Sequence, residues 1–334
     1  MTRRSAVPPP VTAVLDASSR WLPTRLGTVE ELLREQTTGH GELLGADASA
    51  TLAAGGKRLR PLLVLLCAGP DAGPDAVRAA AAVELVHMAT LVHDDILDAA
   101  PLRRGQPTVV AASGRERAVG TGDLLFSRAF ALLAAARDAR SVELIAGASV
   151  ALARGELAQR HDAFDTSIGE QRYLERCRLK TAALFECAVL LGWSAAHAAR
   201  HPRTRERAEG MAEYGRELGL AFQLLDDVLD VTGPPERTGK ARGTDLLDGV
   251  VTLPLILAAR RDPALAEQDL RALDPAAAGS LCDRIAATGV LDEVRARALE
   301  LVAAAKSRLD GERLDPEQRR LLDIVADGVV QRYS

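Results

Sequence analysis

Apolar residues recur at helical spacing through most of the chain, from about Val29 onward. Ala, Leu, Arg and Glu dominate the composition and runs of β-branched residues are short, so we expect helices almost throughout. The pattern predicts an apolar helix over Leu62–Cys67, a long helix from about Ala76 to Ala99, and another from Tyr173 to Leu190. Two to four further helices are expected after Leu255.

Glycine and proline mark where this helical pattern is interrupted. The breaks fall at Gly55-Gly56, at residues 68–75, and near Asp262-Pro263, Asp274-Pro275 and Asp315-Pro316. Residues 1–20, which contain several prolines and serines, are expected to be a frayed N-terminal segment, with residues 21–334 forming a single domain.

Composition narrows the class of protein. With 47% apolar and 26% charged residues, the chain is typical of a soluble globular protein with a large core. A net charge of −4 and only 3% aromatic residues argue against nucleic acid as a partner. No signal-peptide core follows the basic N-terminus, because Pro8-Pro9-Pro10 intervenes. The longest apolar stretch, Thr181 to Ala199, contains Glu186 and His197 and fits a core helix better than a membrane span.

The four cysteines contain no C-x-x-C pair. Cys67, Cys177, Cys187 and Cys282 lie in apolar or mixed helical segments, so we expect buried free thiols in a cytoplasmic protein.

Two clusters of aspartates are the main candidates for a catalytic site. Asp94, Asp95 and Asp98 stand in a D-D-x-x-D spacing near the end of the long predicted helix. Residues four apart lie on one helix face, so Asp94 and Asp98 point the same way. Repelling carboxylates make sense around a hard divalent cation such as magnesium, which takes oxygen ligands and often shares them with phosphates. A solvated acidic face would explain one such cluster equally well.

The same spacing returns at Asp226, Asp227 and Asp230, again within an apolar helical run. Two such clusters, each inside a strongly apolar segment, are improbable by chance. Two arginines, Arg103 and Arg104, follow the first cluster within one or two helical turns and offer forked donors to phosphate oxygens.

With its neighbours, this pair of clusters resembles the trans-isoprenyl (polyprenyl) diphosphate synthase family, from about Gly55 to Pro254. The resemblance and the helical periodicity together predict one all-α domain of antiparallel helices around a central active-site cavity. The resemblance implies magnesium, more than one ion per site, held by Asp94, Asp98, Asp226, Asp227 and Asp230. It also implies a homodimer, with no more than peripheral membrane contact for product release.

Cations and polar residues at other matching positions are assigned by the same resemblance. Lysine occurs only four times, and three of these residues, Lys57, Lys180 and Lys240, sit in matching motifs. Lys57, Arg60, His87 and Arg104 would bind isopentenyl diphosphate. The allylic diphosphate would be bound by Arg103, Lys180, Thr181, Gln223 and Lys240.

Three further stretches are expected to have structural roles only, and one residue, Val250, differs from the family pattern. His93 and the segment Gly120–Leu125 are expected to serve packing, and the H-A-A-R-H lettering at His197 and His201 is read as a helix end rather than a zinc site. Val250 departs from the family pattern, because many members have lysine there. The missing cation is expected either to weaken allylic diphosphate binding or to be one that the longer-chain branch of the family dispenses with.

The expected reaction is condensation of isopentenyl diphosphate with an allylic diphosphate to give an all-trans polyprenyl diphosphate. Electrostatic stabilisation of the departing diphosphate would drive it. In the family, bulky residues before the first cluster stop chain growth, whereas Val86, Ala89 and Thr90 are modest in size here. A product longer than C20 is therefore expected. Alternatives are a geranylgeranyl or farnesyl diphosphate synthase, a terpene cyclase, and a non-catalytic partner subunit of a prenyl synthase.

Overall fold

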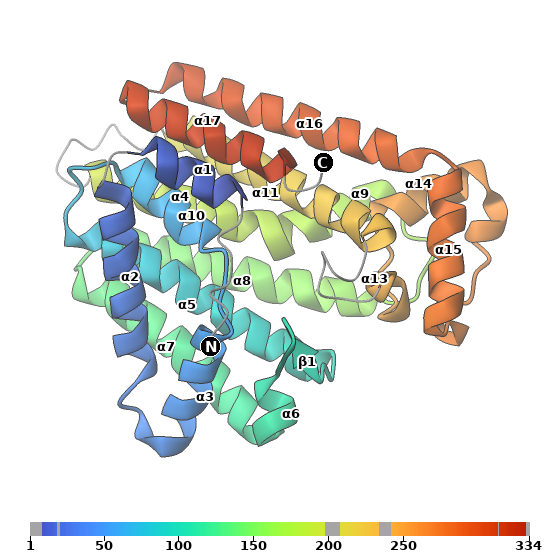
Figure 1. The fold of residues 1–334 in the computed structure, drawn as a ribbon, viewed down its shortest axis with the longest axis horizontal. Coiled ribbons are helices and arrows are strands. Elements are labelled where there is room, and N and C mark those ends of the chain that lie inside the picture. The colour runs from blue at the N-terminus through green and yellow to red at the C-terminus, as the bar shows by residue number, and fades with distance from the viewer. Residues whose placement is uncertain (1–8, 19–20, 198–207, 234–241, 313, 332–334) are drawn as a thin grey trace.

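The computed structural model describes residues 9–18, 21–197, 208–233, 242–312 and 314–331. Long helices, most of them packed side by side, make up nearly all of this part of the chain (Figure 1). Its only strands there form a hairpin of β1 (Leu102–Arg103) and β2 (Gln106–Pro107). The predicted all-α class is confirmed.

The helices of the first half run in the following order. They are α1 (Pro9–Ala17), α2 (Trp21–Thr37), α3 (Gly41–Ala53), α4 (Leu59–Ala68), α5 (Pro74–Leu97), α6 (Val109–Ser113), α7 (Arg115–Ala135) and α8 (Ala139–His161). The second half contains α9 (Glu170–Cys177), η1 (Arg178–Ala182), α10 (Ala183–His197), α11 (Ala208–Thr232), α13 (Thr244–Leu247), α14 (Leu253–Arg261), η3 (Pro263–Leu265), η4 (Leu270–Ala272), α15 (Pro275–Ala287), α16 (Val290–Arg308), η5 (Leu309–Gly311) and α17 (Pro316–Gln331).

Helix α5 lies at the centre of the fold and carries the first aspartate cluster. Pro74 occupies its first turn, where a missing N–H costs no helical hydrogen bond. The middle of the helix is buried on every side, because α2, α4, α7 and α10 all pack against it. This surrounds the predicted metal-binding end of α5 with rigid neighbours.

Small residues allow α5 and α7 to approach closely. A Cβ added at Gly122 of α7 would lie 2.1 Å from His93 Nε2 of α5, so only glycine fits beneath the ring. The His93 ring also packs 5.8 Å from the ring of Phe126. The packing roles predicted for His93 and for the Gly120–Leu125 segment are therefore confirmed.

Helix α11 carries the second aspartate cluster and packs against α10, α16 and α17. Its buried residues include Gly215 and Gly219, at which a Cβ would come within 2.8 Å of Glu186 Cα and 2.6 Å of Ala182 Cα. Glycine at these two positions therefore brings the backbone of α11 against η1 and α10.

The single helix predicted from Tyr173 to Leu190 is interrupted, which corrects the sequence-based expectation. Residues 178–182 form the π-helical segment η1, closed by a hydrogen bond from Ala183 N–H to Arg178 O. A π turn of this kind accommodates one extra residue and is frequent at functional sites. Here the affected segment contains Lys180 and Thr181.

Arg103 and Arg104 follow the long helix, which ends close to the predicted Ala99, and lie in a hairpin that the sequence did not predict. Helix α5 ends at Leu97, Asp98 caps it, and Ala99 has a positive φ of 48°. Arg103 lies in β1, while Arg104 (φ 53°) and Gly105 (φ 75°) form the hairpin turn. The hairpin folds back and places both arginines beside the end of α5.

The expected frayed segment is also partly ordered. Residues 9–17 form α1, which packs against α17, and Val14 is fully buried between them. Arg320 donates a hydrogen bond to the Ala17 carbonyl at 2.7 Å. A buried valine and this contact explain why the segment folds despite its prolines.

One hydrophobic cluster extends from Val14 to Val329. All four cysteines are free and buried, as predicted. Three segments are long and apolar enough to cross a membrane by composition: Pro74–Leu97, Arg115–Ala135 and Glu170–Ala196. Of their apolar windows, 72%, 39% and 56% respectively are buried within the fold, so the window on α7 is the least buried of the three.

Candidate active site

The first aspartate cluster surrounds the C-terminal end of α5. Asp95 is buried and accepts a hydrogen bond from Arg103 Nε at 2.7 Å. Asp98 caps the helix and forms an ion pair with Arg160 of α8. The hairpin and α8 thus flank the cluster with guanidinium groups.

Asp94 is the least compensated carboxyl of this cluster. Its pKa is raised to about 6, chiefly by burial and also by the neighbouring Glu156 and Asp98 carboxylates. The cations of Lys180 and Arg103 oppose this rise. The structure therefore places Asp94 in the electrostatic neighbourhood of two predicted diphosphate-binding residues.

The second cluster lies on the last turns of α11. Asp227 is 1% exposed, accepts from Tyr173 Oη at 2.5 Å through Oδ2, and accepts from Gln223 Nε2 at 2.8 Å through Oδ1. Burial, with the nearby Asp245 carboxylate, raises its pKa to about 8, although the Tyr173 and Gln223 hydrogen bonds oppose the rise. Asp230 accepts a hydrogen bond from the Asp245 backbone N–H at 3.2 Å.

The π segment η1 connects the two clusters. Thr181 donates to Gln223 Oε1 at 2.6 Å, which ties η1 to the second cluster on α11. Lys180 pairs with Glu156 of α8 and acts electrostatically on Asp94 of the first cluster. Lys180 and Thr181 therefore stand between the two predicted metal-binding regions.

A separate group of cations gathers where the loop before α4 meets the hairpin. Arg58 has a positive φ of 50° and bridges two glutamates, donating to Glu30 at 2.5 Å and to Glu84 at 2.7 Å. A Cβ built at Gly56 would lie 2.7 Å from Arg58 Nη1 and 3.5 Å from Arg104 Nη1. Glycine at position 56 therefore permits this loop to lie against both arginines.

Arg60 and His87 complete that cationic region. The Arg60 guanidinium stacks 4.7 Å from the Phe185 ring centroid, and burial lowers its pKa to about 10. Its Nε is buried and has no hydrogen-bond partner within the described ranges. Burial, reinforced by Arg60, Arg104, Arg103 and Arg58, lowers the pKa of His87 well below its usual value. The arginines that lower the His87 pKa concentrate positive charge around it, which favours binding of an anion.

The remaining predicted residues are placed as follows. Lys57 lies in the loop before α4, directly before Arg58 in the sequence. Lys240 and His201 fall outside the described residues. Val250 lies just before α14, and its N–H donates to the Asp245 carbonyl at 2.7 Å.

The three predicted chain-length residues lie on α5 before the first cluster. Val86 and Ala89 are fully buried, and Thr90 is half-buried with its hydroxyl donating to the His87 carbonyl at 2.8 Å. None of them is a large aromatic residue, as the sequence shows.

The carboxylates fit a divalent cation, although they do not form a finished cage. In the described part of the chain no three acidic, histidine or cysteine side chains gather closely enough to hold an ion alone. The raised pKa values of Asp94 and Asp227 show carboxyl groups whose charge lacks compensation, which a cation would supply. Magnesium usually completes its shell with water and substrate phosphates, so a partial protein shell suits it.

Sequence reasoning missed several residues that shape this site. Glu156 and Arg160, one turn apart on α8, hold Lys180 and Asp98, and Tyr173 holds Asp227. The i, i+4 pairing of Glu156 with Arg160 was visible in the sequence, but its direction toward the site was not. A single tyrosine seven residues before Lys180 offers no signal by itself.

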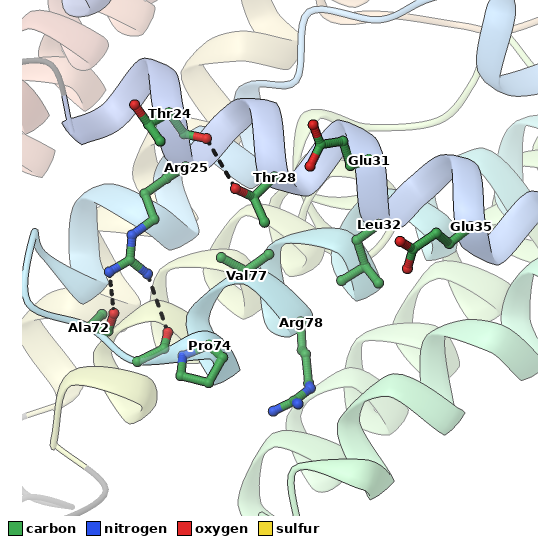
Figure 2. Close-up of a pocket in the computed structure, with 11 residues that line it drawn as sticks. Thr24, Arg25, Thr28, Glu31, Leu32, Glu35, Ala72, Pro74, Val77 and Arg78 are labelled. Atoms are coloured by element: carbon green, nitrogen blue, oxygen red, sulfur yellow. Dashed lines mark hydrogen bonds between the residues drawn. The ribbon is translucent and has the colours of Figure 1, made fainter.

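A pocket of about 590 Å³ lies elsewhere, between α2 and the start of α5 (Figure 2). Arg25 spans one side of it and donates to the Ala72 carbonyl at 2.5 Å and to the Pro70 carbonyl at 3.2 Å. Val77 and Leu32 contribute apolar surface. The first turn of α5 is about 30 Å from Asp94 along the helix axis, so this pocket is separate from the aspartate clusters.

Comparisons with known proteins agree with this arrangement. Residues 42–279 match the family model described as polyprenyl synthetase. Component 2 of the heptaprenyl diphosphate synthase of Geobacillus stearothermophilus is 40% identical over 246 residues, 73% of this chain and 75% of that protein. The geranylgeranyl diphosphate synthase of Methanosarcina mazei is 35% identical over 291 residues, 84% of this chain and 86% of that protein.

Among solved structures, the fold is similar to that of a polyprenyl synthase from Caulobacter crescentus CB15 complexed with calcium and isoprenyl diphosphate. The TM-score is 0.88 at 34% identity, and the superposition covers 100% of both chains. The matched family model spans both aspartate clusters and the π segment between them. This chain therefore belongs to the polyprenyl synthetase family and is a prenyltransferase of the trans-polyprenyl diphosphate synthase type.

Proposed function

We propose that this enzyme condenses isopentenyl diphosphate with an allylic diphosphate in a magnesium-dependent reaction and releases an all-trans polyprenyl diphosphate longer than C20. The observation that carries the proposal is the position of η1. It links Lys180 to the first aspartate cluster and Thr181, through Gln223, to the second. One diphosphate bound at η1 lies within reach of both carboxylate groups.

The allylic site is formed by both clusters and η1. Asp94, Asp98, Asp226, Asp227 and Asp230 would hold magnesium, which supplies Lewis-acid stabilisation of the departing diphosphate. Lys180 donates to diphosphate oxygens, and Arg103, which already lies against Asp95, extends the positive surface. Thr181 and Gln223 orient the same group by hydrogen bonds. Lys240 is proposed to act here as well.

The homoallylic site is the cationic region around the loop before α4. Lys57, Arg60 and Arg104 bind the diphosphate of isopentenyl diphosphate, and Glu84 with Glu30 holds Arg58 and hence the loop in place. His87, whose pKa is lowered by burial and by the neighbouring arginines, is proposed to donate a hydrogen bond to the same diphosphate. As the allylic C–O bond breaks and the diphosphate departs, the alkene held here forms the new carbon–carbon bond, and the cation that results loses a proton to give the longer diphosphate.

Product length is proposed to depend on α5, because the growing chain extends from Asp94 toward the start of this helix. Each helical turn advances about 5.4 Å. Ala89 and Val86 line successive turns without a bulky ring, so growth continues beyond C20. Ala89→Phe is expected to shorten the product by several isoprene units, whereas Ala303→Phe, at an exposed position of α16, leaves its length unchanged.

A homodimer is proposed, with the outward faces of α7 and α8 as its interface. Val119 of α7 is 40% exposed, and Val150 and Leu157 of α8 are 60% and 69% exposed. Val150 and Leu157 are seven residues apart and so share one face of α8. The low buried share of the apolar window on α7 agrees with an interface that a second copy covers. We place the enzyme in the cytoplasm, with peripheral membrane contact only during product release.

A second candidate is a catalytic subunit that requires a different partner protein. The observation in its favour is the printed name of the Geobacillus stearothermophilus relative, which is component 2 of its synthase. The purified chain distinguishes the two. Activity without any other protein supports the homodimer, and activity that appears only after a partner is added supports the second candidate.

The direct test is incubation of the purified protein with magnesium, labelled isopentenyl diphosphate and, in turn, C5, C10, C15 and C20 allylic diphosphates. We expect products beyond C20 that disappear when the metal is chelated. Products that stop at C15 or C20 would retain the reaction and refute the proposed length. Cyclised hydrocarbons with no chain extension would refute the proposed reaction.

A further inference from the structure

Tyr173 is buried, lies on α9 and carries none of the charge expected of a diphosphate-binding residue. Its hydroxyl nevertheless donates a 2.5 Å hydrogen bond to Asp227 Oδ2, the most buried carboxylate of the second cluster. Gln223 donates to the other oxygen of the same carboxylate at 2.8 Å. The two bonds fix the rotation of the Asp227 carboxylate about its side-chain axis.

The π segment explains how Tyr173 and Thr181 both reach α11. Eight residues separate them, and in a regular α-helix this spacing would rotate one side chain by about 80° away from the other. The Ala183-to-Arg178 hydrogen bond shows that the backbone takes a wider turn here. The extra residue absorbed by that turn reduces the rotation, so Tyr173 contacts Asp227 while Thr181 contacts Gln223.

We propose that Tyr173 is a positioning residue for the second aspartate cluster: it holds Asp227 in the orientation that the magnesium–diphosphate complex requires, and η1 is the backbone device that allows it to do so. The inference rests on the proposed function. A carboxylate has about four lone-pair sites, so Asp227 still has capacity for an ion after accepting from Tyr173 and Gln223. Hydrogen-bond partners that orient metal ligands typically contribute 10–100-fold in metal affinity.

The chain offers a matched control in Tyr214. It is also fully buried, lies on α11 itself, and donates one hydrogen bond at 2.8 Å, but to the Leu322 carbonyl of α17 and not to a carboxylate of the site. Tyr173→Phe and Tyr214→Phe therefore each remove one buried hydroxyl, and Tyr173→Phe also removes the contact of that hydroxyl with the Cys177 thiol. Their effects on folding are expected to be similar, while their effects on the site differ.

The experiment measures Mn²⁺ uptake in the presence of inorganic pyrophosphate, by the loss of the free-ion electron paramagnetic resonance signal, and needs no turnover. We expect Tyr173→Phe to weaken uptake about tenfold or more. Tyr214→Phe should match the wild-type protein, and Asp227→Ala should abolish the pyrophosphate-dependent part. Thermal unfolding of each variant separates a folding defect from a binding defect.

The outcomes distinguish this inference from the proposed function. Wild-type protein that shows no pyrophosphate-dependent uptake would refute the proposed function itself. Wild-type uptake that needs Asp227 but is unchanged in Tyr173→Phe would refute the positioning role alone. Equal weakening in both tyrosine variants would also refute it, because the effect would then be general destabilisation.

A second measurement does not depend on Tyr173→Phe remaining folded. The chain has only three tyrosines, so protein grown with 3-fluorotyrosine gives few ¹⁹F resonances. With Tyr214 assigned through its phenylalanine variant, the Tyr173 resonance should shift when Mg²⁺ and pyrophosphate are added together, and the Tyr214 resonance should not. An unmoved Tyr173 resonance under saturating conditions would overturn the proposal.

Discussion

At the scale of single residues, the site is defined by carboxyl groups whose charge the protein alone does not compensate. Asp94 and Asp227 are buried close to other acids, and burial raises both pKa values. Asp95 and Asp98, by contrast, already pair with Arg103 and Arg160. Asp94 and Asp227 are therefore best placed to take a cation from the substrate complex, because burial and neighbouring acids outweigh the cations and hydrogen bonds that already act on them.

Asp94 makes the metal-free protein less stable as pH rises. Its pKa is about 6 in the folded chain against an ordinary value of 3.8, so the folded state binds more protons between these values and stability falls as pH rises through that window. The cost above pH 6 is at most about 3 kcal/mol. Asp94→Asn should therefore raise the melting temperature at pH 8 in the presence of a chelator, and should change it little at pH 3.5.

The same substitution is expected to abolish chain elongation. Adding Mg²⁺ with pyrophosphate should stabilise the wild-type protein and not Asp94→Asn. A melting temperature lowered by the substitution at pH 8 would contradict the assignment of Asp94 as an uncompensated buried acid. Differential scanning fluorimetry across the pH range provides the measurement.

We expect Glu84 to affect the binding of only one of the two substrates, isopentenyl diphosphate. Because it holds Arg58 at 2.7 Å and lies near Arg60, Glu84→Gln should loosen the loop before α4. We expect KM for isopentenyl diphosphate to rise about tenfold, with KM for the allylic diphosphate changed less than twofold, given the 1.5–3 kcal/mol typical of a hydrogen bond to a charged group. Glu186→Gln, which removes a comparable pair with Arg216 away from the loop, is the control in steady-state kinetics.

At the scale of elements, η1 is the feature that connects α5, α8 and α11. Gly155 permits this, because a Cβ at that position would lie 2.6 Å from the Lys180 backbone nitrogen. A collision with backbone cannot be relieved by a side-chain rotation, so any larger residue must displace η1. A single substitution at Gly155 therefore tests the role of η1.

Gly155→Ala is expected to lower kcat at least tenfold and to raise KM for the allylic diphosphate, because Lys180 and Thr181 move together with η1. Gly147→Ala on the same helix meets nothing within 4 Å and should instead stabilise α8 by about 0.5–1 kcal/mol without changing the kinetics. Unchanged kinetics in Gly155→Ala would show that close packing of η1 on α8 is dispensable.

Local sequence determined the two helices that carry the aspartates but not the elements that connect them. The long apolar run before Asp94 and the one before Asp226 each predict a helix with carboxylates at its end, and α5 and α11 confirm this. The π turn at Lys180 has no local signature, since it depends on contacts with Gly155 and α11. The hairpin at Arg103 was missed because Ala99 and Arg104 adopt left-handed backbone conformations that alanine and arginine rarely take.

At the scale of the whole molecule, α7 and α8 leave apolar side chains exposed that most of the other helices bury. If these faces form the proposed homodimer interface, Val150→Glu with Leu157→Glu should convert the protein to monomers by analytical ultracentrifugation. Leu299→Glu replaces a side chain that is 50% exposed on α16 and should leave the dimer intact. A wild-type monomer at micromolar concentration would contradict the proposal before any variant is made.

The central claim is that both aspartate clusters act as one unit on a single allylic diphosphate held by η1. The most direct measurement is the elongation rate of Asp94→Asn, Asp227→Asn and the double variant, with a C15 allylic primer, saturating isopentenyl diphosphate and Mg²⁺. Groups that act together lose most of their effect when either is removed. We therefore predict losses of about 10³-fold or more for each single variant and a double variant no slower than the worse single one. Losses that multiply in the double variant would show that the two clusters contribute independently, and would contradict a shared diphosphate.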